Sequence, residues 1–191
     1  MRSPEFIQEV KNAMEVLHAG GIILYPTDTI WGIGCDATNA DAVRKIYTLK
    51  KRDPNKSLIV LLDQPGRLES YVKNVPGNAW DLIEYSEKPL TIIYDHGRNV
   101  AEGVMADDGT LAVRITKDEF CCALISKLRK PLVSTSANIS GQNFPGSFHQ
   151  VADEILHGVD YVVNLRQEEK ATKIPSTIVR LSDNGIIRFI R

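Results

Sequence analysis

Four cations fall within seven positions of the chain, at Lys50, Lys51, Arg52 and Lys56, and only Asp53 balances them. Such a charge run is often no more than a solvated surface. A lysine and an arginine two positions apart can also grip different phosphate oxygens at once, because arginine offers a planar fork and lysine a point charge. The stretch is therefore a candidate site for a polyphosphate or a phosphodiester.

Two further stretches place polar side chains directly after apolar runs. Residues 134–141 carry five hydroxyl or amide side chains after the apolar pair 132–133, and the Thr-Asp-Thr sequence 27–29 follows the apolar run 22–25. Either stretch could be a polar turn. Open α/β sheets, however, usually bind their ligands beyond the carboxyl ends of buried strands. Both stretches are therefore candidate recognition loops.

Familiar catalytic motifs are missing. The sequence has no Gly-x4-Gly-Lys-Ser/Thr loop, and Gly32-Ile33-Gly34 lacks the third glycine of a dinucleotide fingerprint. The four histidines stand apart, and no cysteine or histidine spacing is typical of a metal cage. Cys35 has no evident histidine partner, which favours a small buried residue over a nucleophile. We expect no metal held by protein ligands alone.

The apolar periodicity predicts helices that alternate with strands. Ser3 and Pro4 are typical of a helix start, and Gly20 ends that run. Asn39 can cap a second helix over 40–49. Further helices are predicted over 76–85, 119–128 and 147–156, and strands over 22–25, 58–62, 90–94, 111–115, 132–133, 161–163, 177–181 and 186–190. The last two strands flank the turn Asp183-Asn184-Gly185, whose Asn-Gly pair indicates a hairpin. The fold class is therefore α/β, with a mixed parallel and antiparallel sheet flanked by helices.

Composition limits the class of protein. A chain of 191 residues, 43% apolar and 25% charged, suits one folded domain over residues 1–191. Its net charge of -1 excludes the global basic field of nonspecific nucleic-acid binders. An odd count of three cysteines suits a reducing compartment, and no long apolar run is present, so we expect a cytoplasmic protein without membrane contact.

Taken together, the polar stretches resemble the YrdC/Sua5 family of threonylcarbamoyl-AMP synthases. Residues 25–34 match that family's Tyr-Pro-Thr-Asp/Glu-Thr opening and its following glycines, Lys50 and Arg52 match its KxR motif, and Ser136 and Asn138 match its SxN motif. The resemblance extends from residue 22 to residue 188. It implies a single YrdC-like catalytic domain with a twisted sheet and a concave basic site, in the short bacterial form without the C-terminal Sua5 extension.

The resemblance also implies a reaction. L-Threonine, bicarbonate and ATP, with Mg²⁺ carried by the nucleotide, give threonylcarbamoyl-AMP and pyrophosphate. The product then passes to a tRNA threonylcarbamoyl-transfer complex that modifies adenosine 37. A carbamate oxygen attacks the α-phosphorus in line with the leaving pyrophosphate, a step that depends on positioning and charge neutralisation more than on a covalent nucleophile.

The family's functional residues map onto eleven positions of this sequence. Lys50 and Arg52 would be catalytic and would stabilise charge on the leaving pyrophosphate. The predicted ATP-binding residues are Lys50, Arg52, Lys56, Thr110, Ser136, Asn138 and Arg188, and the predicted threonine-binding residues are Thr29, Arg114, Ser134 and Ser176. Leu61 departs from the pattern, because some long-form members have a histidine there near threonine.

Three alternatives compete with this prediction. The chain could be a double-stranded RNA or tRNA-binding module, and weak RNA contact is also compatible with an enzyme. It could be a carbamoyl-transfer domain of the hydrogenase-maturation type, although the zinc-finger and acylphosphatase-like parts are missing from this sequence. It could also be a family member that acts on another amine.

Overall fold

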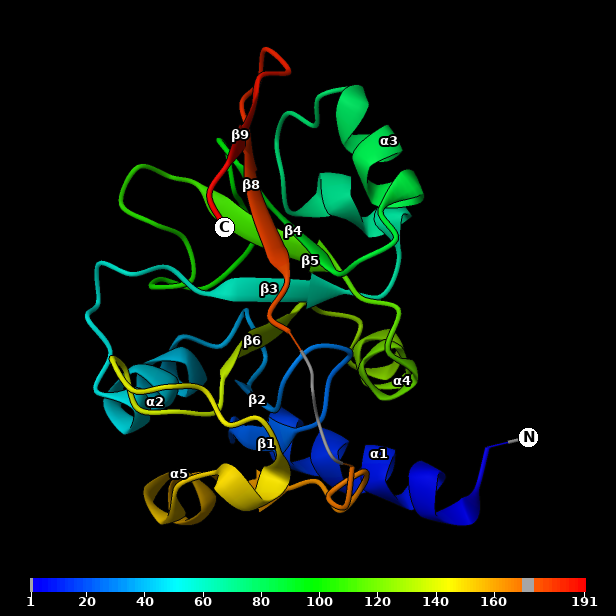
Figure 1. The fold of residues 1–191 in the computed structure, drawn as a ribbon, viewed down its shortest axis with the longest axis vertical. Coiled ribbons are helices and arrows are strands. Elements are labelled where there is room, and N and C mark those ends of the chain that lie inside the picture. Colours follow the sequence, from blue (N-terminus) through cyan, green and yellow to red (C-terminus); the bar gives the residue numbers. More distant parts are fainter. Residues whose placement is uncertain (1, 170–173) are drawn as a thin grey trace.

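One nine-stranded sheet runs through the computed structural model, which describes residues 2–169 and 174–191 (Figure 1). Figure 1 shows the strands turning steadily from β3 to β8, so the sheet is strongly twisted. In spatial order the strands are β7 (Tyr161–Val162), β1 (Ile23–Tyr25), β2 (Gly32–Gly34), β6 (Leu132–Ser136), β3 (Ile59–Leu62), β5 (Leu111–Ile115), β4 (Leu90–Tyr94), β8 (Thr177–Leu181) and β9 (Ile187–Phe189). The pairs β7–β1, β3–β5 and β4–β8 are parallel and the others antiparallel, which confirms the predicted mixed sheet.

Helices cover both faces of this sheet. They are α1 (Pro4–His18), α2 (Ala40–Lys50), α3 (Asn78–Tyr85), α4 (Glu119–Leu128) and α5 (Asp153–Gly158), with 3₁₀ turns at Pro65–Ser70 and Phe148–Gln150. Side chains cap three of the helices: Ser3 accepts from the Phe6 amide and Asn39 from Ala42, as predicted, and Asp118 accepts from Cys121. None of the described helices is long and apolar enough to cross a membrane.

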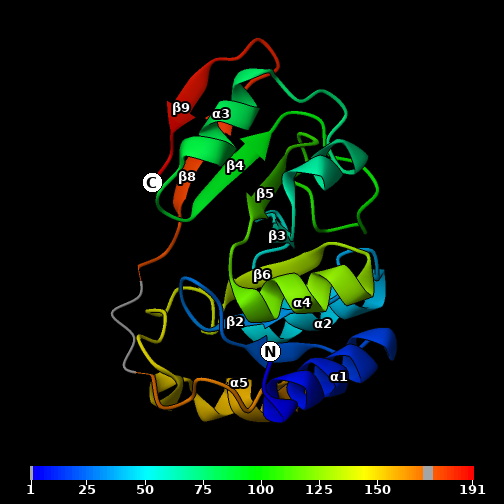
Figure 2. The ribbon, with the colours of Figure 1, turned by 90° about the vertical axis from the view of Figure 1, so that its right-hand side faces the viewer.

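The sheet separates two apolar cores. Alternate residues of β3 point to opposite faces, so Val60 belongs to the core under α2, α3 and α5, and Leu61 to the core under α1 and α4. Figure 2 shows α1 and α4 stacked beside each other, where Phe6 and Phe120 meet edge to face at 6.1 Å. The face that carries Leu61 is left uncovered beyond α4.

Three parts of the predicted secondary structure differ from the structure. No strand was predicted over residues 32–34, which form β2, and the strand predicted over 132–133 continues to Ser136 because it pairs with both β2 and β3. The helix predicted over 147–156 is divided into a 3₁₀ turn and the short α5. The predicted C-terminal hairpin is confirmed, because β8 pairs antiparallel with β9 on either side of Asp183-Asn184-Gly185, although only Gly185 in this turn has a positive φ, of 81°.

The strand register places a row of side chains across the face of the sheet that the helices leave partly uncovered. One row of paired residues crosses six strands through Ser134, Ile59, Ala112, Ile93, Arg180 and Arg188. Paired residues share a face, so the polar end of β6 and the far strands β8 and β9 present side chains to the same side. The candidate site lies on this side of the sheet.

Candidate active site

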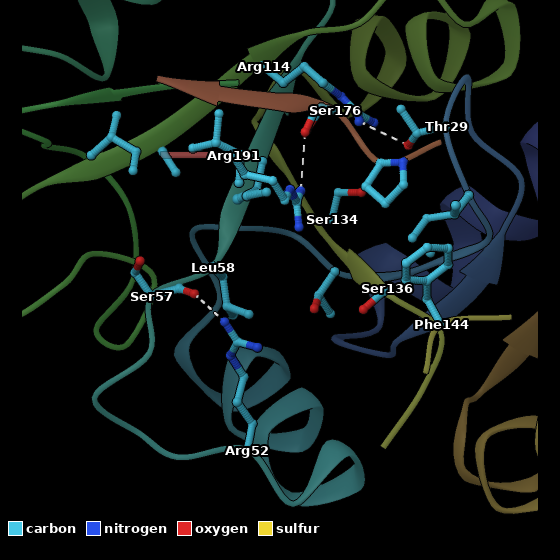
Figure 3. A pocket seen from close by; sticks show the side chains of 18 residues that line it. Thr29, Arg52, Ser57, Leu58, Arg114, Ser134, Ser136, Phe144, Ser176 and Arg191 are labelled. Carbon is cyan, nitrogen blue, oxygen red and sulfur yellow. Dashed lines mark hydrogen bonds between the residues drawn. The ribbon is translucent and has the colours of Figure 1, made fainter. Parts of the chain in front are cut away.

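A cavity of about 330 Å³ opens over the centre of this row. Six predicted site residues line it: Thr29, Arg52, Arg114, Ser134, Ser136 and Ser176 (Figure 3). Arg52 and Arg114 lie on opposite sides of the cavity (Figure 3). The described lining residues include three arginines and no aspartate or glutamate, so the cavity suits an anionic ligand. Its size is within the usual range for small-molecule sites.

Arg114 is a buried cation whose donors are only partly used. Its side chain projects from β5, Nη1 donates to Thr29 Oγ1 at 3.0 Å, and Nη2 lies 3.1 Å from Asp28 Oδ1. Nη2 is thus paired with the Asp28 carboxylate, whereas Nε has no hydrogen-bond partner among the described residues. A planar guanidinium with unused donors at a cavity wall is well suited to a carboxylate ligand.

The Thr29 hydroxyl is fixed by its own loop. The Thr27 and Thr29 hydroxyls lie 2.9 Å apart, Thr27 Oγ1 donates to the Ile30 carbonyl at 2.8 Å, and the Thr29 amide donates to Thr27 Oγ1. The Arg166 guanidinium also donates to the Thr27 carbonyl. Thr29 can therefore present its hydroxyl to Arg114 and the cavity in one orientation.

Two of the lining serines come from segments far apart in the sequence. Ser134 is the middle residue of β6. Ser176 precedes β8, and its hydroxyl lies 2.8 Å from that of the fully buried Thr91 on β4. This buried hydroxyl pair holds Ser176 against the sheet, at the cavity wall.

Arg52 reaches the cavity because α2 ends in a left-handed turn. Lys51 has φ 48°, and the amides of Lys51 and Arg52 donate back to Thr48 and Tyr47. This turn directs Arg52 away from the helix axis. Its Nε donates to the Lys56 carbonyl at 3.1 Å and Nη2 to the Ser57 carbonyl at 2.7 Å. The Arg52 guanidinium is thus anchored at the cavity by its own loop.

Two predicted ATP-binding lysines lie outside the lining. Lys50 is buried, its ammonium donates to the carbonyls of Ser136 and Asn138, and burial together with Arg52 lowers its pKa from 10.5 to about 8. Lys56 is exposed, and its described contacts are made by its backbone: the amide donates to the Asp53 carbonyl, and the carbonyl accepts from Tyr47 and Arg52. Their predicted contacts with ATP stay predictions.

Three other predicted residues also lie outside it. Asn138 donates to the carbonyls of Ile139 and Gln142, and its buried Oδ1 has no partner among the described residues. Thr110 donates to Asp108 at 2.7 Å, just before β5. Thr110 lies on the same face of the sheet as Arg114, four residues before it in the sequence.

Arg188 lines a second cavity on the same face, of about 420 Å³. There Arg180 pairs with Asp95 at 2.9 Å and with Asp108 at 3.4 Å. Hydrogen bonding and charge from these partners raise the pKa of Arg180, which keeps it cationic. No described contact pairs the Arg188 guanidinium, so its predicted role at ATP stays a prediction.

Two lining residues were missed by the sequence analysis. Arg191 donates from Nη2 to the Ser176 carbonyl at 3.2 Å, and it reaches the cavity because its backbone pairs with Ile178 of β8. Phe144 is the only aromatic side chain among the described lining residues, and it is 44% exposed. A single arginine and a loop phenylalanine give no periodic signal, so only the fold could place them.

Comparisons with known proteins show sequence similarity over nearly the whole chain. A profile of the Sua5/YciO/YrdC family, described as telomere recombination, matches residues 15–191. The threonylcarbamoyl-AMP synthase of Pseudoalteromonas translucida is 33% identical over 179 residues, 92% of this chain and 95% of that protein. The chain is thus similar in sequence to enzymes over nearly their whole length.

Solved structures give the same result at the level of the fold. P. abyssi Sua5 in complex with L-threonine superposes with a TM-score of 0.82 and 26% identity, over 95% of this chain and 52% of that one. E. coli YciO has a TM-score of 0.82 at 21% identity, over 96% of this chain and 88% of that one. The chain therefore spans about half the length of P. abyssi Sua5 and most of YciO.

Proposed function

The chain belongs to the Sua5/YciO/YrdC family, and on that premise we propose that it synthesises threonylcarbamoyl-AMP from L-threonine, bicarbonate and ATP. The observation that carries the proposal is that the two sides of the cavity suit two different anionic groups. Arg114 and Thr29 offer a carboxylate site on one side, and Arg52 offers a phosphate site on the other (Figure 3). An amino acid and a nucleotide could thus meet between them.

In this proposal the reaction has two steps, and neither requires a covalent intermediate with the enzyme. The threonine amine and bicarbonate form a carbamate with loss of water. A carbamate oxygen then forms a bond to the α-phosphorus, and the bond to the leaving pyrophosphate breaks. The lining supplies cations and hydroxyls rather than an acid and base pair, which suits positioning and charge neutralisation.

Arg114 binds the threonine carboxylate in this proposal, and Arg52 and Arg191 face the phosphates. Ser134 and Ser176 line the space between them. Because Arg114 is buried, its attraction for a carboxylate is weakly screened by water. The fixed carboxylate leaves the threonine amine, a stronger nucleophile than the side-chain hydroxyl, free to react.

Mg²⁺ fits the site as an ion that the nucleotide carries. No group of three or more histidine, cysteine, aspartate or glutamate residues converges among the described residues. We propose that Mg²⁺ is held mainly by phosphate oxygens and water, with the hydroxyls of the lining as its available protein neighbours. When bound, Mg²⁺ would neutralise charge on the phosphates.

The downstream steps follow from the family and stay proposals. The product, a mixed anhydride, would pass to a tRNA threonylcarbamoyl-transfer complex that modifies adenosine 37. We propose a cytoplasmic location, which the three unpaired cysteines favour. Direct contact with tRNA or double-stranded RNA is left to experiment.

The test is an assay of pyrophosphate release with mass detection of the adenylate. We expect release that requires threonine, bicarbonate and ATP, with little product from serine. Arg52→Met should reduce turnover at least about 100-fold, because it removes a charged donor from the leaving group. Lys51→Met is the matched control, since exposed Lys51 pairs with Glu154 at 2.8 Å and not with the cavity.

Each other outcome points to a different activity. Nucleotide binding without threonine-dependent product would contradict the proposed substrate and favour another amine. RNA affinity that falls steeply with salt, without any adenylate, would favour the RNA-binding alternative. Equal turnover of the Arg52→Met and Lys51→Met variants would remove Arg52 from the mechanism.

A further inference from the structure

Lys50 is a buried lysine that lies beside the cavity but outside its lining. It is the last residue of α2 and is 1% exposed. No ion pair between described residues involves Lys50, although buried lysines usually have a charged partner. Its side chain instead ends on two backbone carbonyls, those of Ser136 and Asn138, the latter at 2.5 Å.

Both ends of Lys50 hold the same turn, residues 136–140. The ammonium binds the carbonyls of Ser136 and Asn138, and the backbone carbonyl of Lys50 accepts from the Ser140 amide at 2.8 Å. An ammonium has three donors and no acceptor, so it can donate to both carbonyls at once. Lys50 therefore links the end of α2 to the end of β6.

This turn positions two of the lining residues. It begins with Ser136 and leads to Phe144, both at the cavity (Figure 3). Asn138 stiffens the same turn from its other side by donating to Ile139 and Gln142 at 2.9 Å and 2.7 Å. Because a phenylalanine can stack on a base, the turn is suited to the part of a nucleotide that AMP and ATP share.

We propose that Lys50 is a positioning residue for the nucleotide, which acts by holding the 136–140 turn rather than by contacting phosphate. The proposal rests on the proposed function only in taking a nucleotide as the ligand. It places the direct phosphate contact of the KxR motif on Arg52, whose guanidinium reaches the cavity. The two motif residues thus have different tasks.

The test compares the affinities of Lys50→Met and Arg52→Met for AMP and for ATP, without threonine and without turnover. If Lys50 acts through the turn, Lys50→Met lowers the affinity for AMP and the affinity for ATP by the same factor, roughly tenfold. Arg52→Met should lower the affinity for ATP much more than the affinity for AMP. Amide hydrogen exchange over residues 137–142 should rise in Lys50→Met and not in Arg52→Met.

Asn138→Ala provides an independent variant that removes no charge. It should copy the effect of Lys50→Met on both nucleotides, and it keeps the test available if Lys50→Met does not fold. A Lys50→Met protein that loses ATP affinity at least tenfold more than AMP affinity would establish direct phosphate contact and overturn the proposal. Unchanged amide exchange over the turn, or unchanged AMP affinity in Asn138→Ala, would also overturn it.

These outcomes are separate from those that test the proposed function. Both nucleotide affinities and amide exchange are measured without an amino acid. A protein that uses another amine would therefore still show the Lys50 effect, and a threonine-specific enzyme could still lack it.

Discussion

At the scale of single residues, Arg114 carries the strongest chemical argument. It is 4% exposed, is held by Thr29 and Asp28, and retains donors without hydrogen bonds among the described residues. Lysine in its place would keep the charge but lose the planar fork. We expect Arg114→Lys to weaken threonine binding at least about tenfold, because charge-assisted hydrogen bonds contribute about 1.5–3 kcal/mol.

Titration calorimetry with threonine measures this change, and the affinity for ATP should stay nearly constant. Arg180→Lys is the matched control, because Arg180 also pairs with aspartates on the same face but lines the other cavity. Unchanged threonine affinity in Arg114→Lys would show that the amino acid binds elsewhere.

Lys50 gives a prediction about stability and pH. Burial and Arg52 lower its pKa from 10.5 to about 8, so between these values the unfolded chain binds more protons than the folded one. Stability from this group therefore rises with pH across that window. The neutral amine still has two N–H donors for its two carbonyls, so the turn stays held.

Comparison with Lys50→Met isolates the effect. As pH rises from about 8 to 10.5, the free energy of unfolding of the native protein should increase relative to that of the variant by up to about 3 kcal/mol. Denaturant titrations at several pH values measure the difference. A constant difference across the window would show that the Lys50 pKa is ordinary.

At the scale of elements, β2 shows how closely strands approach beside the site. A Cβ on Gly34 would lie 2.5 Å from the Val133 carbonyl and 2.7 Å from Tyr25 Cε1. Tyr25 cannot move easily, because it is fully buried and its hydroxyl donates to the Val133 carbonyl at 3.2 Å. Gly34→Ala should therefore destabilise the fold by about 1–3 kcal/mol.

Gly32, on the same strand, is the internal control. A Cβ there would meet Ser134 Oγ and the Thr135 carbonyl at 3.4 Å, which is ordinary contact, but it would project into the cavity. We expect Gly32→Ala to cost little stability and to weaken ligand binding. Denaturant unfolding and nucleotide titration separate the two variants, and equal stability losses would contradict the packing argument.

The elements also show which parts of the fold local sequence specifies. Three helices begin where the sequence offers a capping side chain, at Ser3, Asn39 and Asp118. The buried runs at 90–94 and 111–115 form strands with those same bounds. In these cases the signal lies within the element itself, as a cap or an apolar run.

Elements that depend on distant partners were not predictable in the same way. β2 contains two glycines, which weaken the strand signal, and it forms because β1 and β6 pair with it on both sides. The hydroxyl-rich end of β6 has the composition of a turn, yet its pairing with β2 and β3 keeps it extended. The site residues on these strands were found by motif, while their secondary structure was not.

At the scale of the whole molecule, the cavity is assembled from segments along the entire chain. Strand order places β6, β3, β5 and β4 side by side, although they are far apart in sequence. This order brings Ser134, Arg114 and Ser176, three of the predicted threonine-binding residues, to one cavity. Sequence spacing alone could not show that Thr110 and Arg188 lie further along the same face, because that depends on register.

Arg191 tests whether the C-terminal hairpin takes part in nucleotide binding. Its guanidinium lines the cavity and donates to the Ser176 carbonyl, while the residue itself is exposed. We expect Arg191→Met to weaken ATP binding about fivefold to tenfold and to reduce its salt dependence. The free energy of unfolding should change by less than about 0.5 kcal/mol, because no core packing is lost.

Arg188→Met is the matched comparison, since Arg188 lies on the same hairpin but lines the neighbouring cavity with Arg180 and Asp95. If ATP lies within the central cavity, Arg191→Met has the larger effect. The other outcome is that Arg188→Met lowers the affinity for ATP but not for AMP, while Arg191→Met changes neither affinity. In that case the phosphates extend along the sheet face toward the second cavity. Titration of both variants with AMP and ATP therefore locates the phosphate chain on the row of residues that crosses the sheet.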